Sequence, residues 1–198
     1  MSAEVQPVEV KRALRSWLIA ARARLSQQER AEKSRRIAER VEAVPAFLAA
    51  RVVALYAPLG TEVDALEIAR RAAARGARVL FPRAIPGERR LEFARCEPGE
   101  LVKGSLGAGE PPPGARALDL ADVECVVMPG IGFSEDGHRL GRGGGYYDAT
   151  LRQMAHAARI GVAFDCQVVP ELPREPHDAP LDALVTDART LVFSRERR

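Results

Sequence analysis

Hydrophobic residues in the first part of the chain recur with helical spacing. Apolar positions fall at steps of three and four over residues 8–24, which predicts a helix. Ser26 to Glu29 has the pattern of a capping box, so a second helix is predicted from there to about Val44, where Pro45 closes it. We expect this helical segment, about residues 8–44, to pack on a central sheet. The apolar positions of the first helix are Leu14, Trp17, Leu18 and Ala21.

Short apolar runs after residue 50 predict buried strands, and a helix lies between the first two. The helix is predicted over residues 65–75, with Asp64 and Glu67 at its start and Gly76 at its end. Strands joined by such a crossover pair in parallel. The alternation of strands and helices predicts an α/β fold, a three-layer sandwich with a mostly parallel central sheet, in a single domain over residues 1–198. The predicted strands are 51–56, 78–81, 91–93, 123–128, 159–164, 183–186 and 190–193, with a short apolar stretch at 167–170.

Two stretches lack regular periodicity. Residues 103–114 contain three consecutive prolines and no helix or strand signal, so we expect a stiff, extended segment that forms a wall or lid of a site. Residues 128–148 are rich in glycine, follow a predicted strand and precede a helix predicted over residues 147–158.

The order of strand, glycine-rich loop and helix is typical of a phosphate site, because loop amides point partial positive charge at the ligand. Arg139 and Arg142 add guanidinium groups, and Asp148 is an oxygen ligand that suits Mg2+. Tyr146 occupies the position where the common nucleotide motifs need a different residue, so a mobile surface turn is the alternative interpretation.

Composition limits the classes of function. The net charge of +3 does not by itself indicate a nucleic-acid partner, and the three cysteines form no metal or disulfide pattern. The chain shows neither an apolar leader nor a run of membrane-spanning length, so we expect a cytoplasmic monomer with no membrane partner.

Other charged residues have functional and structural interpretations side by side. Lys11 and Arg15 lie one helical turn apart and could present two cations to one ligand, or they could be solvated surface charges. Glu62 follows a predicted strand at the edge where α/β sheets bind ligands, or it is an ordinary turn carboxylate. The three histidines form no catalytic pattern, which leaves chemistry of the phosphoryl-transfer type.

The glycine-rich stretch resembles a known signature. Met128 to Phe133 followed by Arg139 to Asp148 is similar to the signature of the 5-formyltetrahydrofolate cyclo-ligase family. Shorter matches to that family follow in order along nearly the whole chain: Lys11-x-x-x-Arg15, Tyr56 to Asp64, Phe81-Pro82-Arg83, Glu110-Pro111, and His177-Asp178 with Asp182 and Thr186.

The resemblance implies an ATP- and Mg2+-dependent ring closure of 5-formyltetrahydrofolate to 5,10-methenyltetrahydrofolate. It also implies roles for individual residues, with Arg142 and Tyr146 as the catalytic pair and Asp148 and Asp178 as metal ligands. The implied folate-binding residues are Ala57, Glu62, Arg142, Gly143, Gly144, Gly145 and Tyr146. The implied ATP-binding residues are Lys11, Arg12, Arg15, Arg139, Leu140, Gly141, Arg142, Gly143, Gly144, Gly145, Tyr146 and Tyr147.

One departure from the family pattern bears on catalysis. Gly144 stands where some members carry a lysine, and Arg142 is the candidate to replace that cation. Two other classes of function stay open at this point. A nucleic-acid binder would use the basic helices of residues 8–40, and a sugar-phosphate isomerase or transferase would use a similar fold without ATP.

Overall fold

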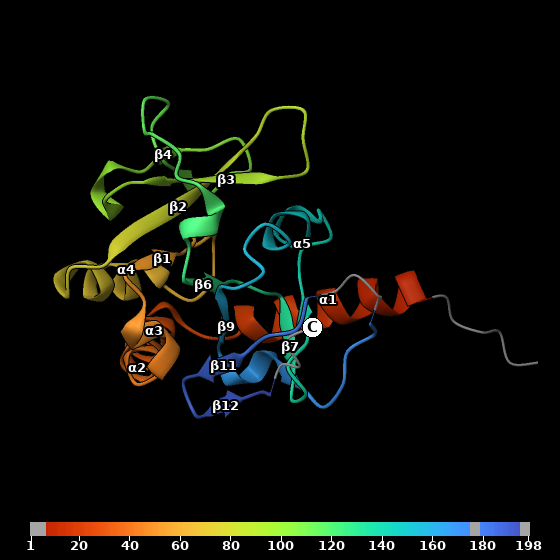
Figure 1. Cartoon of the computed structure of the whole chain (residues 1–198). Helices are drawn as coiled ribbons and strands as arrows, with labels where there is room; N and C mark the ends of the chain where they lie inside the picture. Colours follow the sequence, from red (N-terminus) through yellow and green to blue (C-terminus); the bar gives the residue numbers. More distant parts are fainter. Residues whose placement is uncertain (1–6, 175–178, 195–198) are drawn as a thin grey trace, which may run out of the picture.

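A mostly parallel sheet forms the centre of the molecule. The computed structural model describes residues 7–174 and 179–194, and within them seven strands are ordered β12-β11-β9-β6-β1-β2-β3 (Figure 1). The five inner strands run parallel to their neighbours, whereas β3 and β12 pair antiparallel at the two edges. The strands are β1 (Val52–Ala54), β2 (Arg78–Ala84), β3 (Leu91–Arg95), β6 (Cys125–Met128), β9 (Ala158–Ala163), β11 (Ala183–Thr186) and β12 (Thr190–Val192). The predicted α/β fold is confirmed.

Helices cover both faces of this sheet. On one face α2 (Gln27–Glu42), α3 (Pro45–Ala49) and α4 (Ala65–Ala74) bury Ile37, Phe47 and Ile68. On the other face α5 (Tyr146–Leu151) and the turns after it bury Leu151 and Met154. These two cores make the three layers expected from the sequence.

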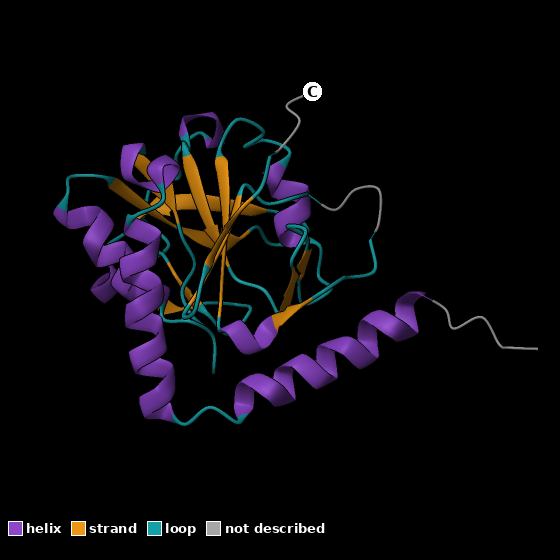
Figure 2. Ribbon diagram, turned by 90° about the horizontal axis from the view of Figure 1, so that it is seen from below, coloured by secondary structure: helices purple, strands orange, loops and turns teal. Residues whose placement is uncertain are grey.

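The first helix, α1 (Pro7–Ala23), lies apart from the α2–α4 layer and beside a second, smaller sheet (Figure 2). Leu18 is its fully buried residue and packs in a separate apolar cluster. Its partners in that cluster are Ile131, Leu140, Val169 and Leu172. The helical segment therefore does not form one layer, because α1 and α2 cover different parts of the fold.

Two helix caps form at the positions that the sequence predicts. The Ser26 hydroxyl accepts from the Glu29 amide at 3.2 Å, and the Glu29 carboxylate accepts from the Ser26 amide at 2.7 Å. Asp64 caps α4 by accepting from the Leu66 amide at 3.0 Å. Both caps satisfy amides that the first turn of a helix leaves without partners.

Two helix boundaries differ from the prediction. Pro45 ends no long helix but begins the short α3, since its fixed φ suits a first helical position. The helix predicted over residues 147–158 is α5 and ends at Leu151. Residues 152–157 continue in turns with bonds to the third residue back, which bring Met154 and Ala157 into the core.

The segment over residues 103–114 was predicted without strands, and that prediction was wrong. Strands β4 (Val102–Lys103) and β5 (Gly109–Glu110) form a small antiparallel hairpin there. Arg83 fixes the prolines that follow, because its Nη1 donates to the Pro112 carbonyl at 2.9 Å while its Nε donates to Glu92.

The glycine-rich stretch is also more ordered than one long loop. Strands β7 (Gly132–Ser134) and β8 (Arg139–Leu140) pair antiparallel, and β10 (Val168–Val169) adds to β7 to complete the second sheet. Only residues 141–145 remain as a loop before α5. Single 3-10 turns lie at Pro98–Glu100, Leu120–Asp122 and Asp165–Gln167. Across residues 7–174 and 179–194, every helix is too short or too polar to span a lipid bilayer.

Candidate active site

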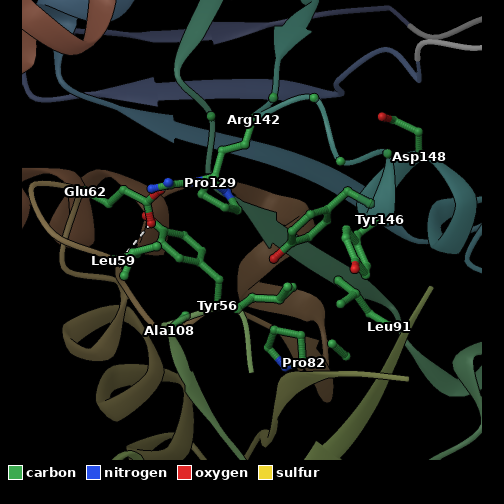
Figure 3. Close-up of a pocket in the computed structure, with 18 of the residues that line it drawn as sticks. Tyr56, Leu59, Glu62, Pro82, Leu91, Ala108, Pro129, Arg142, Tyr146 and Asp148 are labelled. Atoms are coloured by element: carbon green, nitrogen blue, oxygen red, sulfur yellow. Dashed lines mark hydrogen bonds and ion pairs between the residues drawn. The ribbon is translucent and has the colours of Figure 1, made fainter. Parts of the chain in front are cut away.

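A cavity of about 540 Å3 lies at the carboxyl ends of three neighbouring parallel strands (Figure 3). Tyr56 and Ala57 follow β1, Pro82 belongs to β2, and Pro129 and Gly130 follow β6. In the strand order β9-β6-β1-β2, the chain continues from β1 to β2 in one direction across the sheet and from β6 to β9 in the opposite direction. Open α/β sheets bind ligands at such a switch point, and the volume falls in the range of small-molecule sites.

Three further segments, distant in sequence, complete the walls. Helix α1 contributes Lys11 and Arg15, and the β4–β5 hairpin contributes Leu106 and residues 108–110. Residues 139–148 form the remaining wall. The segment expected to be a wall or lid is therefore part of the wall of this cavity.

The loop over residues 141–145 is held at its first residue and shaped by glycine. Arg15 Nε donates to the Gly141 carbonyl at 2.9 Å, which joins α1 to the loop across 126 positions of sequence. Gly143 and Gly145 have φ of 94° and 71°, a conformation in which other residues are strained. A β-carbon added at Gly145 would meet no atom within 4 Å, so the space beside this residue is open. These features favour a shaped ligand-binding loop over a mobile turn.

Two arginines of this segment differ in their surroundings. The Arg139 side chain is 8% exposed, donates to Asp148 at 3.1 Å and lies 5.4 Å from the centre of the Tyr147 ring. The Arg142 side chain is 54% exposed and forms an ion pair with Glu62 at 2.7 Å. Arg139 is thus fixed in the wall, whereas Arg142 has solvent around it and room to reorient.

Glu62 presents a nearly buried carboxylate to the cavity. Its side chain is 7% exposed, and its Oε2 accepts from the Leu59 amide at 3.0 Å, as the dashed line in Figure 3 marks. The Oε1 atom accepts from Nη2 of Arg142 (Figure 3). A carboxylate held by one backbone amide and one exchangeable arginine can exchange that arginine for the N–H groups of a ligand.

Two tyrosines of the cavity wall, Tyr56 and Tyr147, have raised pKa values. Burial raises the pKa of Tyr56 well above its usual value, with the charge of Glu62 adding to the effect, and its hydroxyl donates to the Val63 carbonyl at 2.9 Å. Burial also raises the pKa of Tyr147, although Arg139 opposes the shift. The Tyr147 hydroxyl is buried without a hydrogen-bond partner among the described residues. Since a buried hydroxyl without a partner is costly, Tyr147 is suited to bond a ligand in the cavity.

One of the two predicted metal ligands can be placed. Asp148 lines the cavity, points from the first turn of α5 and keeps its side chain 27% exposed beside Arg139. Asp178 lies outside the described residues, as does His177. Within the described ranges no group of three or more His, Cys, Asp and Glu side chains could hold a metal by itself. A cation here would therefore need ligand oxygens in addition to Asp148.

Nearly all residues predicted for ATP and folate line this one cavity. Arg12 is the exception, since it is exposed on α1 and does not reach the cavity wall. Other wall residues were not predicted as binding residues, because most of them are apolar or small and offer no charged group. These are Tyr56, Leu59, Pro82, Ala84, Leu91, Leu106, Ala108, Gly109, Glu110, Pro129 and Gly130. Several lie in the stretches that resemble the family, such as Pro82 in Phe81-Pro82-Arg83 and Pro129 in Met128 to Phe133.

Comparison with known proteins identifies the family. The family model described as the 5-formyltetrahydrofolate cyclo-ligase family matches residues 7–187. The chain belongs to this family. The 5-formyltetrahydrofolate cyclo-ligase of Escherichia coli K12 is 34% identical over 170 residues, which cover 83% of this chain and 93% of the relative. The cyclo-ligase of Mycolicibacterium smegmatis is 34% identical over 156 residues, covering 75% and 79%.

A solved structure of a relative has the same fold. The chain is similar to the NMR structure of Aquifex aeolicus 5,10-methenyltetrahydrofolate synthetase with a TM-score of 0.82 at 30% identity, covering 96% of this chain and 95% of that one. Membership of the cyclo-ligase family makes this protein an enzyme of the ligase class. The resemblance read from the glycine-rich signature is thereby confirmed.

Proposed function

We propose that the protein converts 5-formyltetrahydrofolate to 5,10-methenyltetrahydrofolate with consumption of ATP and release of ADP and phosphate. The observation that carries the proposal is the composition of one cavity. Lys11, Arg15 and Arg142 bring phosphate-binding cations to the same space as the nearly buried carboxylate of Glu62. A nucleotide and a polar heterocycle can therefore meet there.

ATP is needed because the oxygen of an amide is a poor leaving group. In the proposed reaction the formyl oxygen attacks the γ-phosphorus of ATP and ADP leaves. N10 of the folate then attacks the formyl carbon and loses its proton. Phosphate departs with the former formyl oxygen, which leaves the methenyl bridge between N5 and N10.

The phosphate end of the site consists of cations and a glycine loop. Lys11 and Arg15 of α1 and Arg139 line the same cavity as the loop over residues 141–145, which itself contains Arg142. Charge neutralisation and alignment account for most of the catalysis in phosphoryl transfer, so the site needs no nucleophilic side chain of its own. Arg142 is the cation best suited to follow the transferred group, because it is half exposed and not fixed in the wall.

The folate end consists of Glu62, the backbone near Ala57 and aromatic side chains. A carboxylate is matched by an edge with two N–H donors, which a pterin ring offers. Tyr146 lines the cavity and offers a ring face for stacking (Figure 3). Apolar wall residues, among them Leu59 and Leu106, suit the aminobenzoyl part of the substrate.

Mg2+ fits the same region. Asp148 supplies a hard carboxylate oxygen at the cavity wall, and triphosphate oxygens supply further ligands. The ion would neutralise charge on the phosphates when bound. Asp178 stays a prediction as the second protein ligand.

The test is an assay of the purified protein with 5-formyltetrahydrofolate and Mg-ATP. We expect the near-ultraviolet absorbance of the methenyl product to grow and one ADP to appear for each product. Omission of ATP should abolish both signals. Turnover of a sugar phosphate without ATP, or no methenyl product with Mg-ATP present, would contradict the proposal.

A further inference from the structure

The inner face of α1 carries a third cation besides Lys11 and Arg15. Residues 11, 15, 18 and 22 are separated by four, three and four positions, so they lie on one face of the helix. Leu18 and Arg22 of this stripe are buried, and Arg22 is only 5% exposed. Unlike the other two cations, Arg22 does not line the cavity.

The contacts of Arg22 connect it to the folate end of the site. Its Nε donates to the Thr61 hydroxyl at 3.0 Å, and Thr61 precedes Glu62 in the turn after β1. Burial lowers the pKa of Arg22, and among the charges that act on it the carboxylate of Glu62 has the largest effect, in the opposite direction. A buried guanidinium is stable only beside such an acid. Arg22 is therefore bonded to the turn that carries Glu62 through Thr61, and the charge of Glu62 favours its charged form without a direct ion pair between the two side chains.

Glu62 needs this second cation if ligands occupy the cavity. Its visible partner, Arg142, is half exposed and is also the arginine proposed to bind phosphate. One guanidinium cannot keep its full contact with Glu62 while it binds a triphosphate. Arg22 is buried and does not line the cavity, so we expect it to stay in place when ligands enter.

We propose that Arg22 is a positioning residue that holds the Thr61–Glu62 turn and balances the Glu62 charge when Arg142 moves to the nucleotide. It would act on folate recognition through Glu62, not on ATP. The inference rests on the proposed function, because it takes Glu62 as the carboxylate that binds the N–H edge of the folate. Helix α1 would then contribute to both halves of the site, with Lys11 and Arg15 at the nucleotide and Arg22 at the folate.

The first test compares Arg22→Gln, Arg22→Lys and the control Arg24→Gln, which alters an exposed arginine just after the end of α1. Arg22→Gln should raise KM for 5-formyltetrahydrofolate about 10-fold and change KM for ATP less than about 2-fold, because a lost ground-state contact appears in KM. Arg22→Lys should recover part of the loss, since it keeps the charge but loses the planar fork. Arg24→Gln should behave as the wild type. Equal rises of both KM values would overturn the inference.

A double-mutant cycle tests whether Arg22 acts through Glu62. In the Glu62→Gln background the further change Arg22→Gln should alter folate KM less than about 2-fold, because coupled residues are not additive. A full 10-fold effect in that background would show that Arg22 acts independently of Glu62. Thr61→Val removes the hydrogen bond and leaves the cation, and we expect it to raise folate KM by about 3-fold. If Arg22→Gln does not fold, the folate KM of Thr61→Val and of Arg22→Lys tests the inference instead. An unchanged folate KM in both variants would overturn it.

Measurements on the wild type distinguish a failure of the proposed function from a failure of the role of Arg22. Absence of ATP-dependent product in the wild type contradicts the proposed function itself. Normal wild-type turnover with an unaltered folate KM in a folded Arg22→Gln variant contradicts only the role of Arg22. Thermal unfolding of each variant shows which of them are folded.

Discussion

Arg142 and Glu62 lie 80 positions apart in sequence, and Nη2 of one is 2.7 Å from Oε1 of the other in the wall of the cavity. The pair joins the residue proposed for the phosphates to the residue proposed for the pterin. Each must give up the other when both substrates bind. Binding of one substrate should therefore favour binding of the other.

We expect this exchange to appear as coupling between the substrates. The dissociation constant of 5-formyltetrahydrofolate should fall by about 5-fold or more when a non-hydrolysable ATP analogue with Mg2+ is present, within the usual range of coupling between sites. Isothermal titration of the folate with and without the analogue measures this ratio. In Arg142→Gln the ratio should approach one, and a ratio that stays at the wild-type value would show that the ion pair does not transmit the coupling.

Asp148→Asn should impair the use of Mg-ATP. We expect kcat/KM for ATP to fall about 100-fold, because a neutral amide neither binds Mg2+ well nor balances Arg139, and transition-state contacts to phosphates have effects of this size. Folate binding in the absence of ATP should stay unchanged. Asp136→Asn is the matched control, since Asp136 also pairs with an arginine but does not line the cavity. Full activity in Asp148→Asn would remove this residue from the site.

Gly145→Ala should destabilise the loop by conformation alone. The φ of 71° costs a residue with a β-carbon about 1–2 kcal/mol, whereas no atom within 4 Å would clash with the added methyl. Gly99→Ala is the control, because its surroundings are equally open and its φ is ordinary. Urea unfolding of both variants measures the difference. Equal stability of the two variants would show that the loop relaxes without cost.

The stability of the protein should fall at alkaline pH because of Cys125. Burial raises the pKa of this thiol from 9.0 to about 12, so between these values the unfolded chain loses a proton that the folded chain keeps. Stability is then unaffected below pH 9 and decreases as pH rises above it. Urea unfolding at about pH 8, 9.5 and 10.5, with one value below and two above the usual pKa of a thiol, checks the sign. Cys125→Ala should show a smaller decrease, and an identical decrease would assign the effect to other groups.

Much of the fold followed from local sequence signals. The capping residues Ser26 and Asp64 set the starts of α2 and α4, because the hydrogen bonds that they make are to residues two or three positions away. The parallel strands were found from short apolar runs, since both of their faces are buried. These elements depend on neighbours in sequence and on burial, which a single sequence displays.

Very short strands and elements set by distant partners could not be predicted. Strands β4 and β5 are two residues long, and β7 owes part of its pairing to β10, which lies more than thirty positions later. Periodicity cannot be measured over so few residues. In the site, the glycine-rich signature predicted residues that line the cavity. The pair of Arg142 and Glu62 and the contact of Arg22 with Thr61 could not be predicted, because they join residues that are 80 and 39 positions apart.

The position of α1 has a consequence for how the protein is made. The helix is synthesised more than a hundred positions before Ile131, Leu140, Val169 and Leu172, which bury its Leu18. An isolated helix of this length is only marginally stable in water. The nascent chain therefore exposes Leu18 until these later residues have been synthesised. A chain that stops before Ile131 would leave Leu18 exposed and be prone to aggregation or to capture by chaperones.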